Sequence, residues 1–392
     1  MRRSEKRGIG RELRFEASCG YEKLHQSVFQ GETARAWISR SFEDTCWDSF
    51  LQKSPPGQFQ QSSMWARAKA IDGWKPVRVV ITMDRRIIGG FQILAGLRWW
   101  GRIGYVSKGP VVSDQQAWMA DYATELLRKV GRSEKLLALV VQPPDCCAHI
   151  PASLASGGFR LDSPVTVYRA TWIFNLGEGV EALRLGMARQ TRRKLRQAAQ
   201  RGVSIREGSR RDLGLFFELM LASCQRQGVQ PNPPTIGHLF ALWDAAHPVD
   251  CIRLFIAECN GNPVCGLICI AFGKTFTMWK RGWSGAEDER HPNELITGEA
   301  LRMAAEEGFD LCDYSEFDEK MAMAIRNREP LTTAQERSRH SFITRFGGMP
   351  RLLPASRLYL PNSLAQAAVR LGYKLAGKKR LGGSSPFPGC FG

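Results

Sequence analysis

The chain has 392 residues, enough for two domains that each bury a core, and 43% of them are apolar. Its longest apolar stretches are far too short to cross a bilayer, which argues against a membrane-spanning segment. A net charge of +17 favours polyanionic partners, namely RNA, anionic lipid surfaces or phosphorylated substrates.

The N-terminus, MRRSEKR, is basic and lacks the apolar region of a secretory signal. We therefore expect a cytoplasmic protein, with contact at the inner face of the membrane left open. No Cys-x-x-Cys pair occurs among the eleven cysteines. Five of them fall in apolar, strand-like segments: Cys251, Cys259, Cys265, Cys269 and Cys312. We expect reduced, structural cysteines, no metal site and no bound cofactor.

Residues 1–35 are polar and basic without sustained periodicity, and we expect them to be weakly ordered. A first domain over residues 36–175 follows. Its apolar periodicity and its Gly and Pro breaks predict helices over 43–52 and 62–71, a hairpin of 77–81 and 90–94, a strand over 102–106, a helix over 115–130, a strand over 136–142 and last strands within 159–174.

A second domain is expected over residues 176–360, followed by a basic, flexible tail over 361–392. Its pattern predicts a helix over 183–201, a strand over 203–207, helices over 213–226 and 236–246, a hairpin of 252–256 and 266–270 extended by 275–279, a helix over 294–307 with Asn293 as its N-cap, and a strand over 309–314.

The two predicted hairpins resemble each other. In both, an apolar run with one Arg (Arg78, Arg253) is followed by a polar turn, a Gly and a second apolar run. With one residue of slack in the turn the two copies superimpose. Because a hairpin cannot bury its own faces, a repeated hairpin indicates a repeated domain, and the seam between the copies is where we expect a site.

Two segments of the first domain combine residue types that suit an anionic ligand. Residues 59–65 read FQQSSMW and are followed by Lys69 and by Gly73-Trp74. Residues 105–110 read YVSKGP, which places a ring and a cation beside a turn with free backbone N–H groups at the end of a strand. A strand that simply ends in a Gly-Pro turn explains the second segment equally simply.

Together these segments resemble the FemAB/FemX family of non-ribosomal peptidyltransferases. In that family Gln-Ser-x-x-Trp, Lys and Gly-Trp precede Tyr-x-x-Arg/Lys-Gly-Pro at similar distances. The second half continues the match with a basic helix over 192–198, Trp-Ser-Gly at 283–285, His-Pro-Asn-Glu at 291–294, Gly-Phe-Asp-Leu-Cys-Asp at 308–313 and Phe-Gly-Gly at 346–348. The resemblance covers roughly residues 36–360.

The resemblance implies an α/β fold of two tandem GNAT-like domains, each a mixed twisted sheet flanked by helices. It also implies an acyltransferase that moves an aminoacyl group from aminoacyl-tRNA to an amine of a lipid- or nucleotide-linked peptidoglycan precursor. Both partners are polyanions, which agrees with the charge. The sequence carries no signal for the number of subunits, and no DNA-reading motif is present.

The chemistry is aminolysis of an ester or thioester, which needs a group that removes a proton and a donor for the oxyanion. The candidate catalytic carboxylates are Asp313 and Glu316; a loop-capping carboxylate explains Asp313 equally well. The matching positions assigned to substrate binding are Trp65, Lys69, Tyr105, Lys108, Gly109 and Trp283. Arg192, Arg193 and Arg196 are candidates for a tRNA backbone or a membrane, against the alternative of a solvated helix face.

One departure bears on the mechanism. The family commonly has Phe-Lys shortly before Phe-Gly-Gly, with the Lys near the reacting carbonyl, and here the pair is Phe342-Ile343. If this segment is a strand, only one of Thr344 and Arg345 shares the direction of position 343. Two alternatives therefore stay open, an acyl-CoA-dependent N-acyltransferase and a non-catalytic binding module. No Arg/Gln-x-x-Gly-x-Gly/Ala loop before a helix supports the first.

Overall fold

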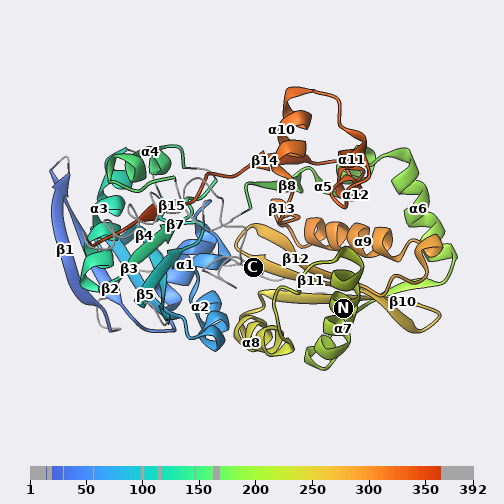
Figure 1. Cartoon of the computed structure of the whole chain (residues 1–392), viewed down its shortest axis with the longest axis horizontal. Helices are drawn as coiled ribbons and strands as arrows, with labels where there is room; N and C mark the ends of the chain where they lie inside the picture. Colours follow the sequence, from blue (N-terminus) through green and yellow to red (C-terminus); the bar gives the residue numbers. More distant parts are fainter. Residues whose placement is uncertain are drawn as a thin grey trace, which may run out of the picture.

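The computed structural model describes residues 15, 20–29, 31–55, 57–98, 101–113, 117–145, 147–161 and 168–362. The tail expected over 361–392 lies, beyond residue 362, outside this part of the chain. Two twisted mixed sheets form the body of the molecule, one from each half (Figure 1).

The first sheet has the strand order β1-β2-β3-β4-β5-β7-β15, with β6 paired to β4. Only β5 and β7 run parallel among these strands, and the other pairs are antiparallel. The strands are β1 Glu22–Phe29, β2 Glu32–Ser39, β3 Lys75–Met83, β4 Arg86–Arg98, β5 Gly101–Val106, β6 Val111–Val112, β7 Ala138–Val141 and β15 Arg357–Tyr359.

The second sheet repeats this plan with the order β14-β8-β13-β12-β11-β10-β9. Here the parallel pair is β12 with β13. The strands are β8 Ala170–Asn175, β9 Val203–Glu207, β10 Ile252–Cys259, β11 Asn262–Phe272, β12 Thr275–Trp283, β13 Leu311–Asp313 and β14 Met349–Leu352.

Helices flank both sheets. The longer ones are α1 Thr45–Lys53, α2 Ser63–Lys69, α3 Ala117–Ser133, α4 His149–Ser156, α5 Gly179–Gly186, α6 Arg189–Gln200, α7 Leu213–Gln227, α8 Ile236–Ala246, α9 Pro292–Glu306 and α10 Glu319–Asn327. Two single turns, α11 Thr333–Glu336 and α12 Ser341–Thr344, follow α10. Short 3₁₀ turns lie at Phe59–Gln61, Ala70–Asp72, Arg210–Asp212, His247–Val249 and Asp288–Arg290. The expected α/β fold of two GNAT-like sheets is confirmed.

Three apolar cores alternate with the sheets. One lies under α3 and α4, a second lies under α5, α9 and α10, and a third joins the halves. The third core contains Trp65 and Met64 from the first half together with Phe216, Leu239 and Ile268 from the second. Because this core is continuous, the seam between the two sheets is a packed interface.

The helix expected over 183–201 is instead two helices. α5 ends at Gly186, and Met187 has an extended backbone (φ −72°, ψ 144°) and is buried. The next residue, Ala188, donates its N–H to the Arg345 carbonyl at 2.9 Å. The apolar residues of α5 and α6 repeat with nearly one continuous helical period, so the sequence does not mark a break. The break coincides with the hydrogen bond from Ala188 to Arg345, a residue far away in the chain.

Three further expectations need correction. Residues 22–29 and 32–39 form paired strands, so the described part of the N-terminal segment is ordered from residue 20. β8 lies in the second sheet although its residues were assigned to the first domain. Conversely β15, from the end of the second half, pairs with β7 in the first sheet. The chain therefore crosses the seam twice, and the exact domain boundaries stay a prediction.

The repeated hairpin is present in both sheets and keeps its bulge. Val80 pairs with Gly90 and Ile256 pairs with Gly266, and the register shifts two residues before each Gly, at Ile88 and Val264. Aligned by pairing, the two turns have the same length. The sequence comparison placed a one-residue difference in length in the turn, and this is wrong. By strand pairing, Arg78 corresponds to Leu254 rather than to Arg253.

Candidate functional site

A pocket of about 800 Å³ opens at the seam. Residues of the first half that line it include Trp65, Tyr105 and Lys108, and those of the second half include Lys280 and Asp313. Its wall is formed by the end of β5 and by the bulged part of β12. These two strands occupy equivalent positions in the two repeated sheets. The site expected at the seam is thus a pocket built from both copies.

A buried polar network holds the first motif in place. The Gln61 side chain accepts from the Gln92 backbone N–H at 2.7 Å and donates to the Ser107 carbonyl at 2.7 Å. Ser62 caps α2 by accepting from the Trp65 backbone N–H. Because Gln61 ties the start of α2 to the turn after β5, the Gln-Ser pair fixes the geometry between the two motifs instead of meeting a ligand.

The turn after β5 presents Lys108. Its backbone has φ +53°, in the left-handed region that non-glycine residues seldom adopt. The next residue, Gly109, was expected to bind substrate through a free N–H, but it donates to the Gln142 carbonyl at 3.0 Å. A Cβ at Gly109 would lie 2.8 Å from the Gln61 side chain. Gly109 therefore allows close packing that positions Lys108, and Lys108 lines the pocket.

Trp65 and Tyr105 also line the pocket, as the sequence predicts for a site, and both are almost fully buried. The Trp65 indole N–H is buried without a hydrogen-bond partner among the described residues. Lys69 does not line the pocket. Its ammonium lies over the Trp65 ring, 4.8 Å from the centroid, so it stands behind that ring.

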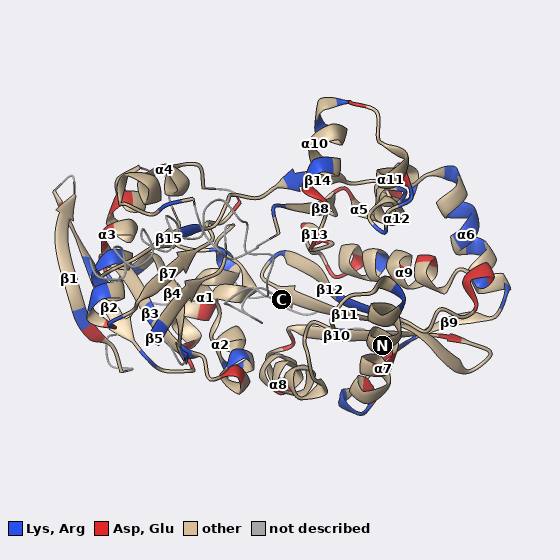
Figure 2. Ribbon diagram, viewed as in Figure 1, with Lys and Arg blue, Asp and Glu red and all other residues tan. Residues whose placement is uncertain are grey.

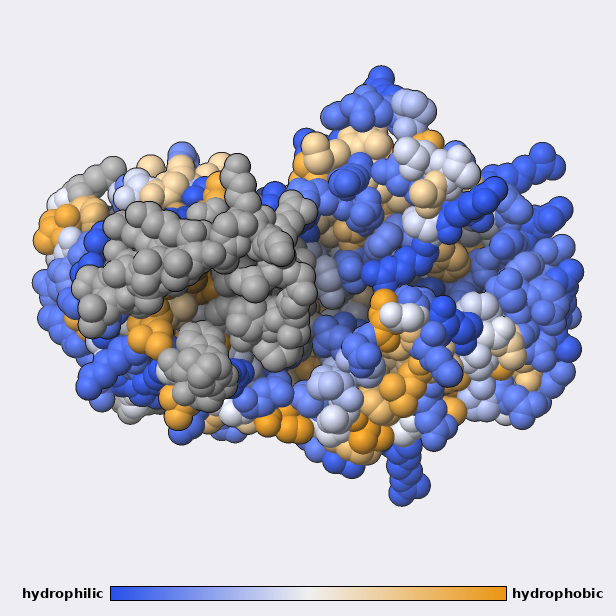
Figure 3. All heavy atoms as spheres, in the orientation of Figure 1, coloured by the Kyte–Doolittle hydropathy of each residue, from blue (hydrophilic) through white to orange (hydrophobic). Residues whose placement is uncertain are grey.

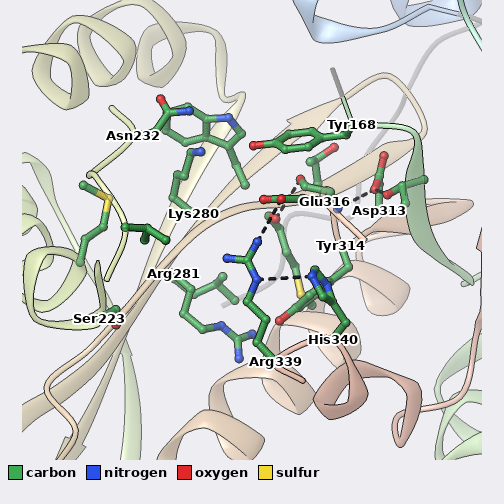
Figure 4. Close-up of a pocket in the computed structure, with 18 of the residues that line it drawn as sticks. Tyr168, Ser223, Asn232, Lys280, Arg281, Asp313, Tyr314, Glu316, Arg339 and His340 are labelled. Atoms are coloured by element: carbon green, nitrogen blue, oxygen red, sulfur yellow. Dashed lines mark hydrogen bonds and ion pairs between the residues drawn. The ribbon is translucent and has the colours of Figure 1, made fainter. Parts of the chain in front are cut away.

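The two candidate carboxylates lie in the pocket in different surroundings. Asp313 accepts from the Thr171 hydroxyl and from the Ser315 backbone N–H, both at Oδ1, and burial raises its pKa. Within the described residues Oδ2 of Asp313 has no hydrogen-bond partner. Glu316 forms an ion pair with Arg339 at 3.0 Å (Figure 4).

Sequence reasoning missed several basic residues of the site, Lys280 and Arg281 among them. Lys280 and Arg281 lie side by side on β12 and line the pocket. Ile268 pairs with Lys280 and Cys269 pairs with Met278, so Trp279 is a bulged residue. A bulge next to a site re-aims the side chains that follow it. Nothing in the sequence marks a bulge here, and a single Lys-Arg in a strand resembles a solvated face.

Arg281 is held by contacts on several sides. Its guanidinium donates to the Thr297 hydroxyl at 2.7 Å and lies over the rings of Phe342 and Tyr314, at 5.2 Å and 5.6 Å from their centroids. At the rim, Trp283 lies under Arg226 at 4.7 Å and donates its indole N–H to the Ala286 carbonyl. Trp283 therefore lines the pocket as expected, but its polar atom is already bonded.

The segment around Ile343 is a helical turn, α12, and not a strand. Alternation therefore does not apply to Thr344 and Arg345. Ile343 is fully buried in the core under α9, whereas Phe342 lines the pocket. Position 343 thus contributes packing in this chain. Similarly, His291 rather than Asn293 precedes α9, and Asn293 lines the pocket and accepts from the Cys265 thiol.

The basic residues of α6 lie away from the pocket, at the far end of the second half (Figure 2). Arg192 donates to three carbonyl oxygens at the end of α5, those of Arg184, Leu185 and Met187. Arg192 thus joins α5 to α6, whereas Arg193 and Arg196 are exposed. Figure 3 shows this end of the molecule as largely hydrophilic.

Two kinds of feature are absent from the described residues, a membrane-spanning helix and a metal-binding cluster. No helix among them is long and apolar enough to cross a bilayer. No group of three or more His, Cys, Asp and Glu in that part of the chain is arranged to hold a metal ion. The five cysteines expected in strands are buried.

Comparison with known families and structures agrees with this architecture. A sequence model of the FemAB family matches residues 42–232, and one of an acetyltransferase (GNAT) domain matches residues 186–320. A crystal structure titled FemX superposes with a TM-score of 0.70 at 18% identity, covering 83% of this chain and 96% of that one. At this identity the superposition shows a shared fold.

The curated relatives are enzymes named Lipid II:glycine glycyltransferase. The protein from Staphylococcus saprophyticus is 26% identical over 233 residues, which cover 56% of this chain and 56% of the relative. The protein from Staphylococcus aureus MRSA252 is 25% identical over 223 residues, covering 54% of this chain and 52% of the relative. The chain thus spans about half the length of the curated relatives that it matches.

Proposed function

We propose that this chain, which a FemAB family model matches over residues 42–232, is a member of that family and an acyltransferase that moves an aminoacyl group from aminoacyl-tRNA to an amine of a lipid-linked peptidoglycan precursor. The observation that carries the proposal is the pocket at the seam of the two sheets, with cations from both halves and carboxylates from the second. The relatives act on Lipid II, and this supports a lipid-linked acceptor.

The roles follow from the positions. Lys108, which faces the pocket from the first half, binds the phosphates of the acceptor, and Lys69 supports it from behind Trp65. Asp313 and Glu316 hold the attacking ammonium, because carboxylates in a buried pocket favour a nearby cation. Arg281, fixed between two rings and Thr297, stabilises the oxyanion of the tetrahedral intermediate.

The exposed arginines of α6, Arg193 and Arg196, follow the backbone of the tRNA in this proposal. The protein acts in the cytoplasm, at the inner face of the membrane where a lipid-linked acceptor is accessible. The net charge of +17 supports both contacts, since each partner is a polyanion.

An acyl-CoA donor is the second candidate, favoured by the GNAT match over residues 186–320. Titration of the protein with charged tRNA and, separately, with acetyl-CoA, each at two salt concentrations, distinguishes the two. We expect salt-sensitive tRNA binding without CoA binding. CoA binding without tRNA binding would instead assign an acyl-CoA-dependent N-acyltransferase, and binding of neither would contradict both.

A further inference from the structure

Lys280 is a half-buried cation of the site that the proposed roles do not use. It lies on β12 directly after the bulged Trp279, and its ammonium is 5.2 Å from the centroid of the Trp279 ring. It lines the pocket together with Glu316 and Tyr168 (Figure 4). A lysine held by a bulge in a seam pocket has a fixed direction that a surface lysine lacks.

The neighbours of Lys280 leave its nitrogen available. No carboxylate among the described residues forms an ion pair with it. The closest acid in its surroundings, Glu316, is paired with Arg339, and Asp313 is bonded to Thr171 and Ser315. Both carboxylates therefore have partners other than Lys280, and the contact of the Lys280 nitrogen is with the Trp279 ring.

Resting on the proposed function, we infer that Lys280 is the general base of the transfer: its neutral amine removes the protons that the attacking nitrogen loses and gives the second of them to the leaving oxygen. The role needs a nitrogen that faces the pocket and that no acid holds in an ion pair, and Lys280 meets both conditions among the described residues.

The step balances without a further reactant. The Lys280 amine takes one proton from the acceptor ammonium, which becomes a neutral amine. That amine attacks the ester carbonyl, a C–N bond forms, and the carbonyl electrons move to the oxyanion beside Arg281. Lys280 passes this first proton to water. The attacking nitrogen of the tetrahedral intermediate then gives its second proton to the neutral Lys280 amine. As the C–O bond to the donor breaks, its electron pair takes that proton from Lys280, which leaves a hydroxyl on the donor, an amide on the acceptor and one proton in the solvent.

The charges around Lys280 agree with this role. Burial, together with the charges of Lys69 on α2 and Arg339 before α12, lowers its pKa to about 8, although Glu316 and Cys224 on α7 act in the opposite direction. The neutral amine is therefore a sizeable fraction near neutral pH. Because the base must be deprotonated, the rate rises with pH and levels off above about pH 8.

The first arm of the test needs no substrate. The full chain is labelled with trace acetic anhydride across pH 6–11, and the modification of each lysine is read by mass spectrometry. We expect the labelling rate of Lys280 to reach half its maximum near pH 8, well below that of the exposed Lys320 in the same sample. If the labelling rate of Lys280 depends on pH in the same way as that of Lys320, or if Lys280 stays unlabelled, the inference is overturned.

The second arm separates a base from a fixed cation. The assay is transfer from charged tRNA to Lipid II. It compares Lys280→Met and Lys280→Arg with the control Lys274→Met, which changes an exposed lysine in the turn before β12. Arginine keeps the charge but cannot lose a proton, so we expect both Lys280 variants to lose about 10²- to 10⁴-fold in kcat with little change in KM. Lys274→Met should match the wild type.

An active Lys280→Arg variant would overturn the inference and assign the residue to binding. Thermal unfolding of the three variants shows that they are folded. If the wild type transfers nothing with these substrates, the proposed function fails, and the labelling arm still tests whether Lys280 carries an accessible neutral amine.

Discussion

The two sheets follow one plan but present different chemistry at the seam. β5 is paired with β4 without a register shift, and it ends in the turn that presents Lys108. β12 occupies the equivalent place in the second sheet and is bulged at Trp279, which brings Lys280 and Arg281 into the pocket. The comparison suggests that the first half binds and positions, while the second half supplies the ionisable groups that react.

The buried networks differ in the same way. In the first half Arg78 is fully buried, pairs with Asp44 at 3.2 Å and donates to the Gln92 side chain at 2.6 Å. In the second half the corresponding residue is Leu254, and the nearby Arg253 pairs with Asp250, whose side chain is 86% exposed. The first half therefore depends on a rigid polar core that the second half replaces with apolar packing.

The largest effect is expected from breaking that core. Arg78→Met leaves Asp44 and Gln92 buried without their partner, and we expect a loss of about 3–5 kcal/mol in the free energy of unfolding. Arg253→Met removes only a partly exposed ion pair and should cost about 1 kcal/mol or less. Urea unfolding of both variants measures the difference, and equal losses would contradict the proposed contrast between the halves.

The binding role of the first half is tested at Lys108. Removing a charge-assisted contact to a phosphate costs about 1.5–3 kcal/mol, so Lys108→Ala should weaken Lipid II binding about 10- to 100-fold with the fold intact. Lys75→Ala, an exposed lysine at the start of β3, is the matched control. Titration by fluorescence measures both, and equal affinities for the two variants would place the acceptor elsewhere.

The second half is expected to contact the tRNA through α6. Arg193→Ala with Arg196→Ala should reduce the slope of log affinity for charged tRNA against log salt by roughly 2, because each contact releases about one counterion. Lys53→Ala with Arg85→Ala, exposed in the first half, should leave the slope unchanged. If both double variants behave alike, α6 is a solvated face.

The smallest effect concerns the edges of the sheets. β2 is covered by β1, whereas β9 is the outer strand of its sheet and carries Arg206, bonded to Asp212 and Glu258. The hydrogen bond from Arg206 lowers the pKa of Asp212 to about 2, below its ordinary 3.8. A depressed carboxyl pKa contributes stability above pH 3.8 that is lost as the pH falls toward 2.

Asp212→Asn should therefore remove part of the acid-dependent loss of stability between about pH 4 and pH 2, an effect of about 1 kcal/mol or less. Thermal unfolding at several pH values compares the variant with the wild type. Parallel curves for the two proteins in that window would show that the Arg206 ion pairs do not stabilise the edge.

The sequence predicted most of the elements because their signals are local. α7, α8 and both hairpins begin and end within a few residues of the expected positions, since Gly and Pro stops and apolar periods mark them. The break between α5 and α6 was missed because its cause is the Arg345 carbonyl, far away in the chain. The exchange of β8 and β15 between the sheets has no local signal either.

The site was partly predictable for a similar reason. Trp65, Tyr105, Lys108, Trp283, Asp313 and Glu316 all line the pocket, because motif spacing marks them. Gly109 and Arg192 instead bond to carbonyl groups within the fold. Lys280 could not be found, because its place in the pocket depends on a bulge at Trp279 that the sequence does not mark.

A transfer assay is the most direct test of the proposed function. The purified chain is incubated with tRNA charged with a mixture of labelled amino acids and with Lipid II, and the lipid product is analysed by mass spectrometry. We predict a Lipid II species heavier by one or more aminoacyl groups, absent when the tRNA is uncharged and undiminished by added acetyl-CoA. Unmodified Lipid II, or Lipid II acetylated when acetyl-CoA is present, would contradict the proposed aminoacyl transfer.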